Sequence, residues 1–123
     1  MSDVDEKIRA MLNKSYAKAQ GDQGGKYICW KFCQEIYGLF GLQLQHFFHQ
    51  RELTKVAEPA VPCIVLFRAV MDWHSGVVWP DGLHFIHACS PDIFDPSPDE
   101  YIVCKDRLTA WPYKQLIEGY YAP

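Results

Sequence analysis

The feature that most constrains the fold of this chain is a pair of apolar segments on either side of the turn sequence Pro80-Asp81-Gly82. Residues 73–79 and 83–89 contain valine, isoleucine and aromatic side chains, and such segments around a glycine-containing turn predict a β-hairpin. The continuous apolar run 63–67 is typical of a strand that is buried on both faces. The C-terminal half is therefore expected to form an antiparallel sheet.

Two histidines of this hairpin can be placed by the alternation of side chains along a strand. His74 and His87 share a face of the sheet only if the loop between the strands has an even number of residues. A two-residue turn and a four-residue loop starting at Pro80 both satisfy this condition. The longer loop is expected because proline lacks the N–H that flanks the shorter turn. Both registers place Gly76 opposite His87 and turn His84 to the other face.

The N-terminal half has helical spacing instead. Apolar residues recurring up to Tyr16 predict a helix over residues 3–19. A second helix is predicted from Cys29 to about Phe40, preceded by a glycine-rich loop and followed by Gly41 as its C-terminal cap. The cysteine lies on the apolar face of this helix.

The remaining elements are weaker. The mixed segment 51–56 fits a short helix, residues 101–104 fit a short strand, and the apolar spacing of residues 113–120 predicts about two helical turns. Helices first and antiparallel strands second indicate an α+β fold. A chain of 123 residues is the size of one domain, so residues 1–123 are expected to form a single unit.

Composition excludes several functions. A net charge of −3 gives no basic surface for nucleic acid, and no apolar run is long enough to span a membrane. The polar, acidic N-terminus does not resemble a signal peptide, so the protein is expected to be cytoplasmic as synthesised. The five cysteines have no paired spacing, and most of them are interpreted as reduced core residues. No metal site is expected, although His46 and His49 have a spacing that zinc ligands use.

Cys29 is the candidate nucleophile. A thiol in the first turn of a helix experiences the positive end of the helix dipole, which lowers its pKa toward the reactive thiolate. Nucleophilic cysteine catalysis also needs a base and a group that orients the base, and His74 and His87 can supply both. The alternative interpretation is a structural cysteine on an apolar helix face.

These residues resemble the NlpC-type papain-like cysteine peptidases. The resemblance consists of a cysteine that opens a helix, His74-Ser75-Gly76-Val77-Val78, and Phe85-Ile86-His87-Ala88 after the turn. It implies a papain-like fold, with N-terminal helices packed on an antiparallel sheet, and no cofactor. It also implies that Cys29 is the nucleophile facing the base His74 across the helix–sheet boundary, that His87 orients the base, and that backbone N–H groups at the helix start bind the oxyanion.

The resemblance also implies a substrate and a place of action. Members of the family mostly cut amide bonds in bacterial cell-wall peptides, commonly between D-glutamate and diaminopimelate. Small members without a signal peptide occur in phage tail tips, so a phage tail or another delivery protein is an expected partner that would bring the enzyme to the wall. The residues expected to contact substrate are Tyr16, Tyr27, Trp30 and Ser75. Two alternatives stay open: an inactive structural or assembly protein on the same fold, and a thiol acyltransferase or amidase toxin.

Overall fold

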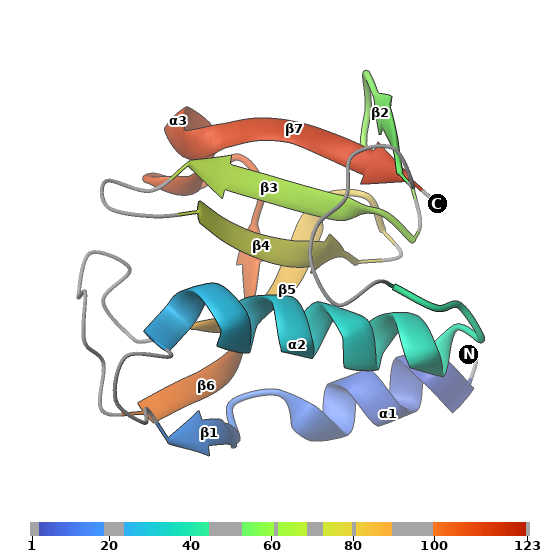
Figure 1. The fold of residues 1–123 in the computed structure, drawn as a ribbon, viewed down its shortest axis with the longest axis vertical. Helices are drawn as coiled ribbons and strands as arrows, with labels where there is room; N and C mark the ends of the chain where they lie inside the picture. The colour runs from blue at the N-terminus through green and yellow to red at the C-terminus, as the bar shows by residue number, and fades with distance from the viewer. Residues whose placement is uncertain are drawn as a thin grey trace.

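The computed structural model describes residues 3–18, 24–44, 53–60, 62–68, 73–79, 81–89 and 100–122 (Figure 1). Its elements in chain order are α1 (Asp3–Met11), β1 (Ser15–Lys18), α2 (Gly24–Leu39), β2 (Thr54–Val56), β3 (Ile64–Arg68), β4 (Trp73–Val78), β5 (His84–Cys89), β6 (Glu100–Arg107), α3 (Tyr113–Leu116) and β7 (Ile117–Ala122). Within these residues the strands form one antiparallel sheet in the order β1-β6-β5-β4-β3-β7-β2. The protein therefore has the predicted α+β class.

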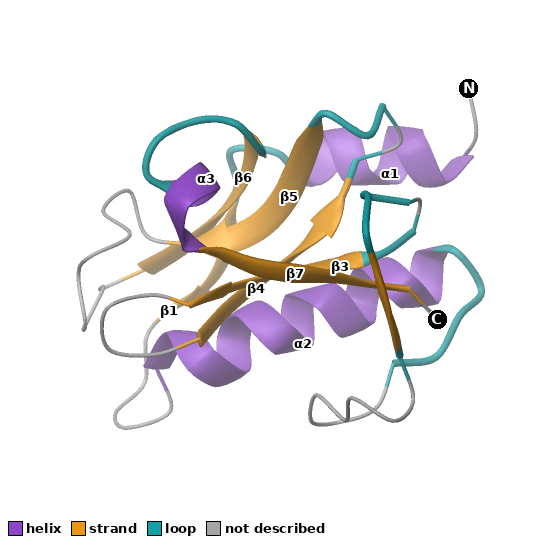
Figure 2. Ribbon diagram, turned by 90° about the horizontal axis from the view of Figure 1, so that it is seen from above, coloured by secondary structure: helices purple, strands orange, loops and turns teal. Residues whose placement is uncertain are grey.

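The inner strand β3, which lies between β4 and β7, is buried on both faces, as predicted. Its side chains alternate between two hydrophobic clusters: Ile64 and Leu66 pack with α2, whereas Val65 and Phe67 pack with residues from α3 and β7. Figure 2 shows α2 on one face of the sheet and the short α3 on the other. The sheet therefore separates two cores, and the helix that carries Cys29 covers only one of them.

Helix α1 ends earlier than the sequence pattern predicts. The predicted helix over residues 3–19 is wrong beyond Met11, because Asn13 adopts a left-handed conformation with φ of 64°. The backbone N–H of Asn13 donates to the carbonyl of Val103 at 2.8 Å, and the N–H of Val103 donates to the carbonyl of Lys14 at 3.0 Å. Pairing with β6 thus diverts the chain into β1, although Tyr16 keeps a helical spacing to the apolar residues before it.

Helix α2 ends where predicted but begins five residues earlier than predicted, at Gly24 instead of Cys29. Glycine has a low helix propensity, which is why the pattern indicated a loop here. Packing of α2 against β4 and β5 outweighs that local preference. At the other end, Gly41 has a φ of +75° and the N–H of Leu42 donates to the carbonyl of Tyr37 at 2.9 Å. This geometry confirms the glycine cap.

The predicted two-turn helix near the C-terminus is also wrong. It is limited to α3, and the chain then continues as β7, which lies between β3 and β2 in the sheet. The proposed short helix over residues 51–56 is likewise replaced at Thr54–Val56 by β2, whose partner is β7. Both errors arise from strand pairing: β7 pairs with the edge of β3, and β2 pairs with the outer edge of β7. Residues 45–52 lie outside the described part of the chain.

The hairpin of β4 and β5 has the predicted register. Val77 pairs with Ile86, Val78 pairs with Phe85, and the N–H of Trp79 donates to the carbonyl of His84 at 2.8 Å. Four residues, 80–83, therefore separate Trp79 from His84, and this even number puts His74 and His87 on the same face of the sheet.

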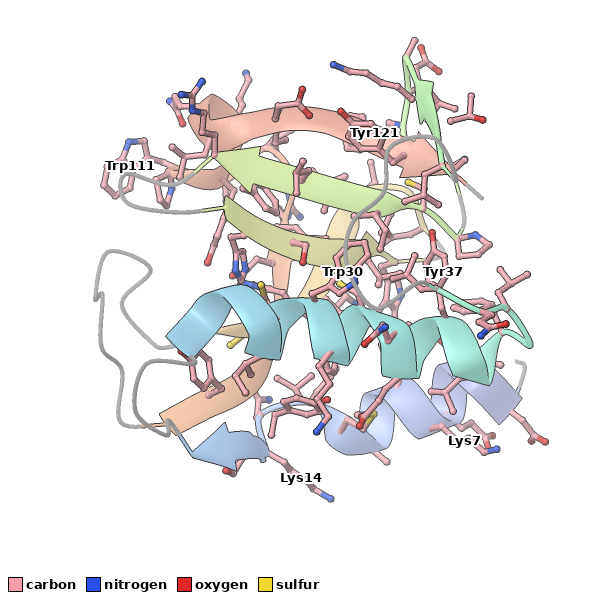
Figure 3. All side chains as sticks on the ribbon, in the orientation of Figure 1. Lys7, Lys14, Trp30, Tyr37, Trp111 and Tyr121 are labelled. Carbon is pink, nitrogen blue, oxygen red and sulfur yellow. The ribbon has the colours of Figure 1, made fainter. Side chains whose placement is uncertain are left out.

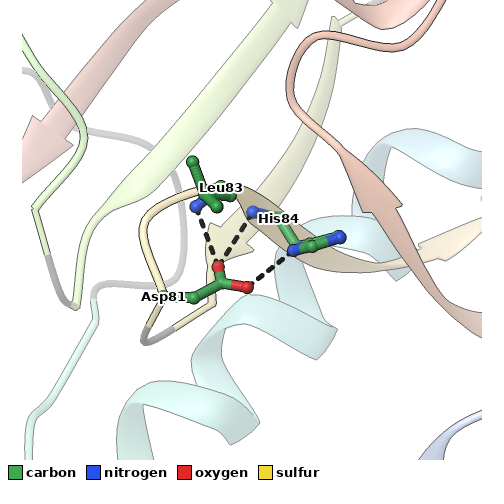
Figure 4. A network of polar contacts seen from close by, with 3 residues as sticks. All are labelled: Asp81, Leu83 and His84. Carbon is green, nitrogen blue, oxygen red and sulfur yellow. Dashed lines mark hydrogen bonds and ion pairs between the residues drawn. The ribbon is translucent and has the colours of Figure 1, made fainter.

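The tip of the hairpin is held by the side chain of Asp81 (Figure 4). One carboxylate oxygen, Oδ1, accepts hydrogen bonds from the N–H groups of Leu83 and His84 at 2.8 and 3.1 Å. The other, Oδ2, lies 2.7 Å from Nδ1 of His84. His84 is thus bound at the hairpin tip, on the face of β5 opposite His87, as predicted.

Gly76 marks the closest approach of β4 to β5. A Cβ atom added to Gly76 would lie 2.9 Å from the carbonyl oxygen of Ile86, 2.9 Å from Cδ2 of Phe85 and 3.3 Å from Cβ of His87. These atoms belong to a paired strand and a buried ring, so they have no room to move. We expect Gly76→Ala to lower the free energy of unfolding by about 1–3 kcal/mol, the usual range for overpacking, measured by urea denaturation.

The control for this substitution is Gly38→Ala in α2. Apart from its chain neighbours and the backbone of its own helix, an added Cβ at Gly38 meets no atom within 4 Å, and alanine is the better helix former. We therefore expect Gly38→Ala to raise the free energy of unfolding by up to about 1 kcal/mol. Equal effects of the two substitutions would contradict the close contact at Gly76.

Candidate active site

Two cysteines of α2 converge on one hydroxyl of β4. Cys29 and Cys33 lie one turn apart on the buried face of the helix. Cys33 Sγ donates to Ser75 Oγ at 3.6 Å, and Ser75 Oγ donates to Cys29 Sγ at 3.6 Å. All three residues are buried. Burial, and then the nearby Cys29, raise the pKa of Cys33 well above its ordinary value, so Cys33 stays a protonated donor. Cys33 is thus a core residue, as expected from the apolar face of the helix.

On the other side of the same strand, the two histidines of the hairpin form a hydrogen-bonded pair. His74 Nε2 lies 2.7 Å from His87 Nδ1, and the rings meet edge to face with centroids 4.9 Å apart. His87 is completely buried, whereas His74 is partly exposed. The prediction that these histidines share a face of the sheet is confirmed.

The pair continues to a carboxylate. His87 Nε2 lies 2.7 Å from Oδ2 of Asp106 in β6. His74, His87 and Asp106 therefore form an unbroken series of two short hydrogen bonds across three neighbouring strands.

Asp106 did not emerge from the sequence as a site residue. The predicted strand 101–104 stops short of it, because the apolar run ends before the charged sequence Lys105-Asp106-Arg107. The observed β6 extends to Arg107, and its register pairs His87 with Cys104 and Phe85 with Asp106. Alternation along the longer strand then puts Asp106 on the face of His87. A predicted strand that continued to Arg107 would have placed Asp106 on the face of His87 and so identified it as a site residue.

Aromatic rings enclose the histidine pair. Phe67 lies 5.8 Å from His74, and Phe85 and Tyr113 lie 4.5 and 5.4 Å from His87, measured between ring centroids. This enclosure has an electrostatic effect. Burial, followed by the proximity of His87, holds the pKa of His74 well below its ordinary value. Burial also lowers the pKa of His87, although the hydrogen bond to Asp106 opposes this shift. Both imidazoles are therefore neutral at pH 7, with one ring hydrogen each.

The thiol and the histidine pair are connected through adjacent residues of β4. Phe67 and Phe85 belong to the cluster on the α3 side, whereas the cysteines bonded to Ser75 belong to α2 on the opposite side. His74 and Ser75 thus project from opposite faces of the strand. The Cys29 thiol accepts a hydrogen bond from Ser75, the chain neighbour of His74. A direct contact between Cys29 and His74 stays a prediction.

The early start of α2 changes the surroundings of Cys29. The first four N–H groups of a helix lack intrahelical partners, and in α2 these belong to residues 24–27. Cys29 is the sixth residue, in the second turn, so its own N–H lies inside the helical hydrogen-bond pattern. The expectation that Cys29 occupies the first turn is therefore wrong, and the dipole acts on its thiol less strongly than expected.

The residues expected to contact substrate are mostly buried. Trp30 is 8% exposed and projects from α2 into the core, as Figure 3 shows, and Ser75 is 3% exposed. Tyr16 lies in β1, partly buried, with its ring edge to face against Phe32 at 5.2 Å. The side chain of Tyr27 lies outside the described part of the structure. Trp30 and Ser75 therefore offer little surface to a substrate.

Comparison of the chain with protein-family models gives no match, and comparison with curated proteins gives none. The resemblance to NlpC-type peptidases accordingly rests on the motifs around Cys29, His74 and His87. Among the described residues, no group of three or more His, Cys, Asp or Glu side chains is placed to hold a metal ion. His46 and His49 lie outside those residues. No helix in the described ranges is long and apolar enough to cross a membrane.

Proposed function

We propose that the protein is a papain-like cysteine peptidase that hydrolyses amide bonds in bacterial cell-wall peptides. In this proposal Cys29 is the nucleophile, His74 is the general base and His87 orients the base. One observation carries the proposal. His74, which is hydrogen-bonded to His87, is the chain neighbour of Ser75, and the Ser75 hydroxyl contacts the Cys29 thiol. A cysteine, a base and an orienting group within one small region are the elements that nucleophilic thiol catalysis requires.

The location of His74 supports the approach of its ring to the thiol. His74 is the second residue of β4, and it is partly exposed. Adjacent Cα atoms are about 3.8 Å apart, so the backbone of His74 lies close to the Ser75 hydroxyl that is bonded to Cys29. Because His74 lies near the start of β4, its ring can reach around the end of the strand from one face of the sheet toward the other. We propose that the imidazole meets the thiol there when substrate is bound.

The proposed reaction is acyl transfer to the thiol followed by hydrolysis. His74 accepts the proton of Cys29, and the thiolate attacks the carbonyl carbon of the amide. The unpaired N–H groups at the start of α2 stabilise the resulting oxyanion. His74 then donates the proton to the leaving amine, which gives a thioester. Water, deprotonated by His74, attacks the thioester, releases the acid and restores the thiol.

The substrate and the route to it follow from the resemblance. The bond we propose is an amide of the cell-wall stem peptide, such as that between D-glutamate and diaminopimelate. A phage tail or a comparable delivery protein is the proposed partner that carries the enzyme to the wall.

The test measures how fast Cys29→Ala hydrolyses purified peptidoglycan. The appearance of new amino groups and chromatography of the released peptides report the reaction. We expect the rate to fall by about 10⁴-fold or more, because the nucleophile is removed. Cys33→Ala is the matched control, since it removes a thiol of the same helix that contacts the same Ser75. Circular dichroism of both variants serves to check that they fold.

Three outcomes would overturn the proposal. Full hydrolysis by Cys29→Ala would remove the nucleophile from the mechanism. Equal wall binding by wild type and variant, with hydrolysis by neither, would favour a structural or assembly protein. A stable acyl-thioester on Cys29 in the presence of a lipid donor would favour an acyltransferase.

A further inference from the structure

Asp106 ends the series of hydrogen bonds that starts at His74, and its chemistry determines the direction of the whole series. A carboxylate can only accept hydrogen bonds, so Nε2 of His87 must carry the hydrogen that points to Asp106. The neutral ring of His87 then has a lone pair on Nδ1. That nitrogen lies 2.7 Å from Nε2 of His74, which must therefore be the donor. One carboxylate thus determines the tautomers of two imidazoles.

We infer that Asp106 is a positioning residue that holds His74 in the Nε2–H tautomer and so makes Nδ1 of His74 the basic nitrogen of the site. The consequence for catalysis rests on the proposed function, whereas the tautomers do not. Without Asp106, His87 could place its hydrogen on Nδ1 and accept nothing from His74. The hydrogen of His74 would then move to Nδ1, and the nitrogen available to a thiol would no longer be a base.

The surroundings favour this role over a purely structural ion pair. His87 is completely buried between Phe85 and Tyr113, so no water competes for its nitrogens. Asp106 is a charged group that contacts this ring, with its Oδ2 2.7 Å from Nε2 of His87. Burial lowers the pKa of both histidines, which keeps them neutral, and only a neutral ring has a tautomer to select.

The hairpin offers a matched comparison. Asp81 lies 2.7 Å from a histidine ring too, but its partner is His84, on the other face of β5 and at the exposed tip. Removing Asp81 deletes a carboxylate–histidine contact of equal length without touching the series from His74 to Asp106.

The test is nuclear magnetic resonance of the full chain labelled with ¹⁵N-histidine, recorded at pH 8, where hydrogen-bearing and bare ring nitrogens give separate signals. Signals are assigned from His74→Gln and His87→Gln. In the wild type we expect hydrogen on Nε2 of both rings. In Asp106→Ala we expect averaged signals from mixed tautomers on both rings, whereas Asp81→Ala should change only His84. Asp106→Asn, whose amide oxygen can still accept, should restore the wild-type tautomers at least in part.

The catalytic consequence is measured separately, on peptidoglycan. We expect Asp106→Ala to reduce kcat by about 10²-fold or more with KM unchanged, because a wrong tautomer of the base has a large effect on turnover. Hydrogen on Nδ1 of His87 in the wild type would overturn the inference even if no variant folds. So would Asp106→Ala with unchanged tautomers. The expected tautomers without any hydrolysis would instead overturn the proposed function and leave the role of Asp106 intact.

Discussion

Replacing His74 by alanine is expected to reduce hydrolysis of peptidoglycan by about 10³- to 10⁴-fold while the protein stays folded. His74 is the proposed base, and its removal also takes the hydrogen-bond partner from Nδ1 of the buried His87, so the free energy of unfolding of this variant is measured beside its activity. The loss should appear in kcat, because the imidazole acts on the proton of the thiol and not on substrate binding. Steady-state kinetics on a soluble stem-peptide substrate separates kcat from KM.

The matched control for this variant is His84→Ala. His84 belongs to the same hairpin, but it contacts Asp81 at the tip and faces away from His87. We expect His84→Ala to retain wild-type kcat. Equal losses in both variants would indicate that the hairpin as a whole, rather than the imidazole of His74, is required.

Replacing Phe85 by alanine is expected to lower the free energy of unfolding by about 3–5 kcal/mol, which is the usual cost of deleting a buried phenylalanine side chain. Phe85 is completely buried, and its ring lies 4.9 Å from both Phe67 and Tyr113 and 4.5 Å from His87. The deletion would therefore leave a cavity beside the histidine pair. Urea denaturation followed by tryptophan fluorescence measures the change.

Leu83→Ala is the control for this effect. Leu83 lies two residues before Phe85 and is 67% exposed, and the hydrogen bond that it gives to Asp81 comes from its backbone. We expect a change of less than about 0.5 kcal/mol, as for other surface substitutions. A comparable loss for Leu83→Ala would contradict the assignment of the aromatic cluster as the stabilising core of this hairpin.

The hairpin was predictable because strong local constraints agree. The turn residues limit the loop length, and strict alternation along a strand converts loop length into the relative orientation of His74 and His87. The core position of β3 was predictable for a similar reason, since a continuous apolar run has few other places in a fold of this size.

The errors arise where pairing between distant segments outweighs a local pattern. Tyr16 and residues 117–120 keep helical spacing, yet both segments are strands, because β6 and β3 need partners. The start of α2 was missed because glycine suggests a loop. Asp106 was missed because the predicted strand ended with its apolar residues at Cys104, whereas β6 continues to Arg107. In each of these cases, the neighbouring residues in the sequence do not indicate the structure that the segment adopts.

The order of the strands in the sheet has a consequence for how the protein forms. Ser15 in β1 pairs with Ile102 in β6, and Thr54 in β2 pairs with Ala122 in β7, so each outer strand must wait for a segment synthesised much later. Sheets with such long sequence separation between partners fold slowly, in about milliseconds to seconds. A nascent chain therefore holds Cys29 and His74 well before Asp106 has been translated. Because the hydrogen-bonded series ends at Asp106, we expect the candidate site to mature only with the last quarter of the chain.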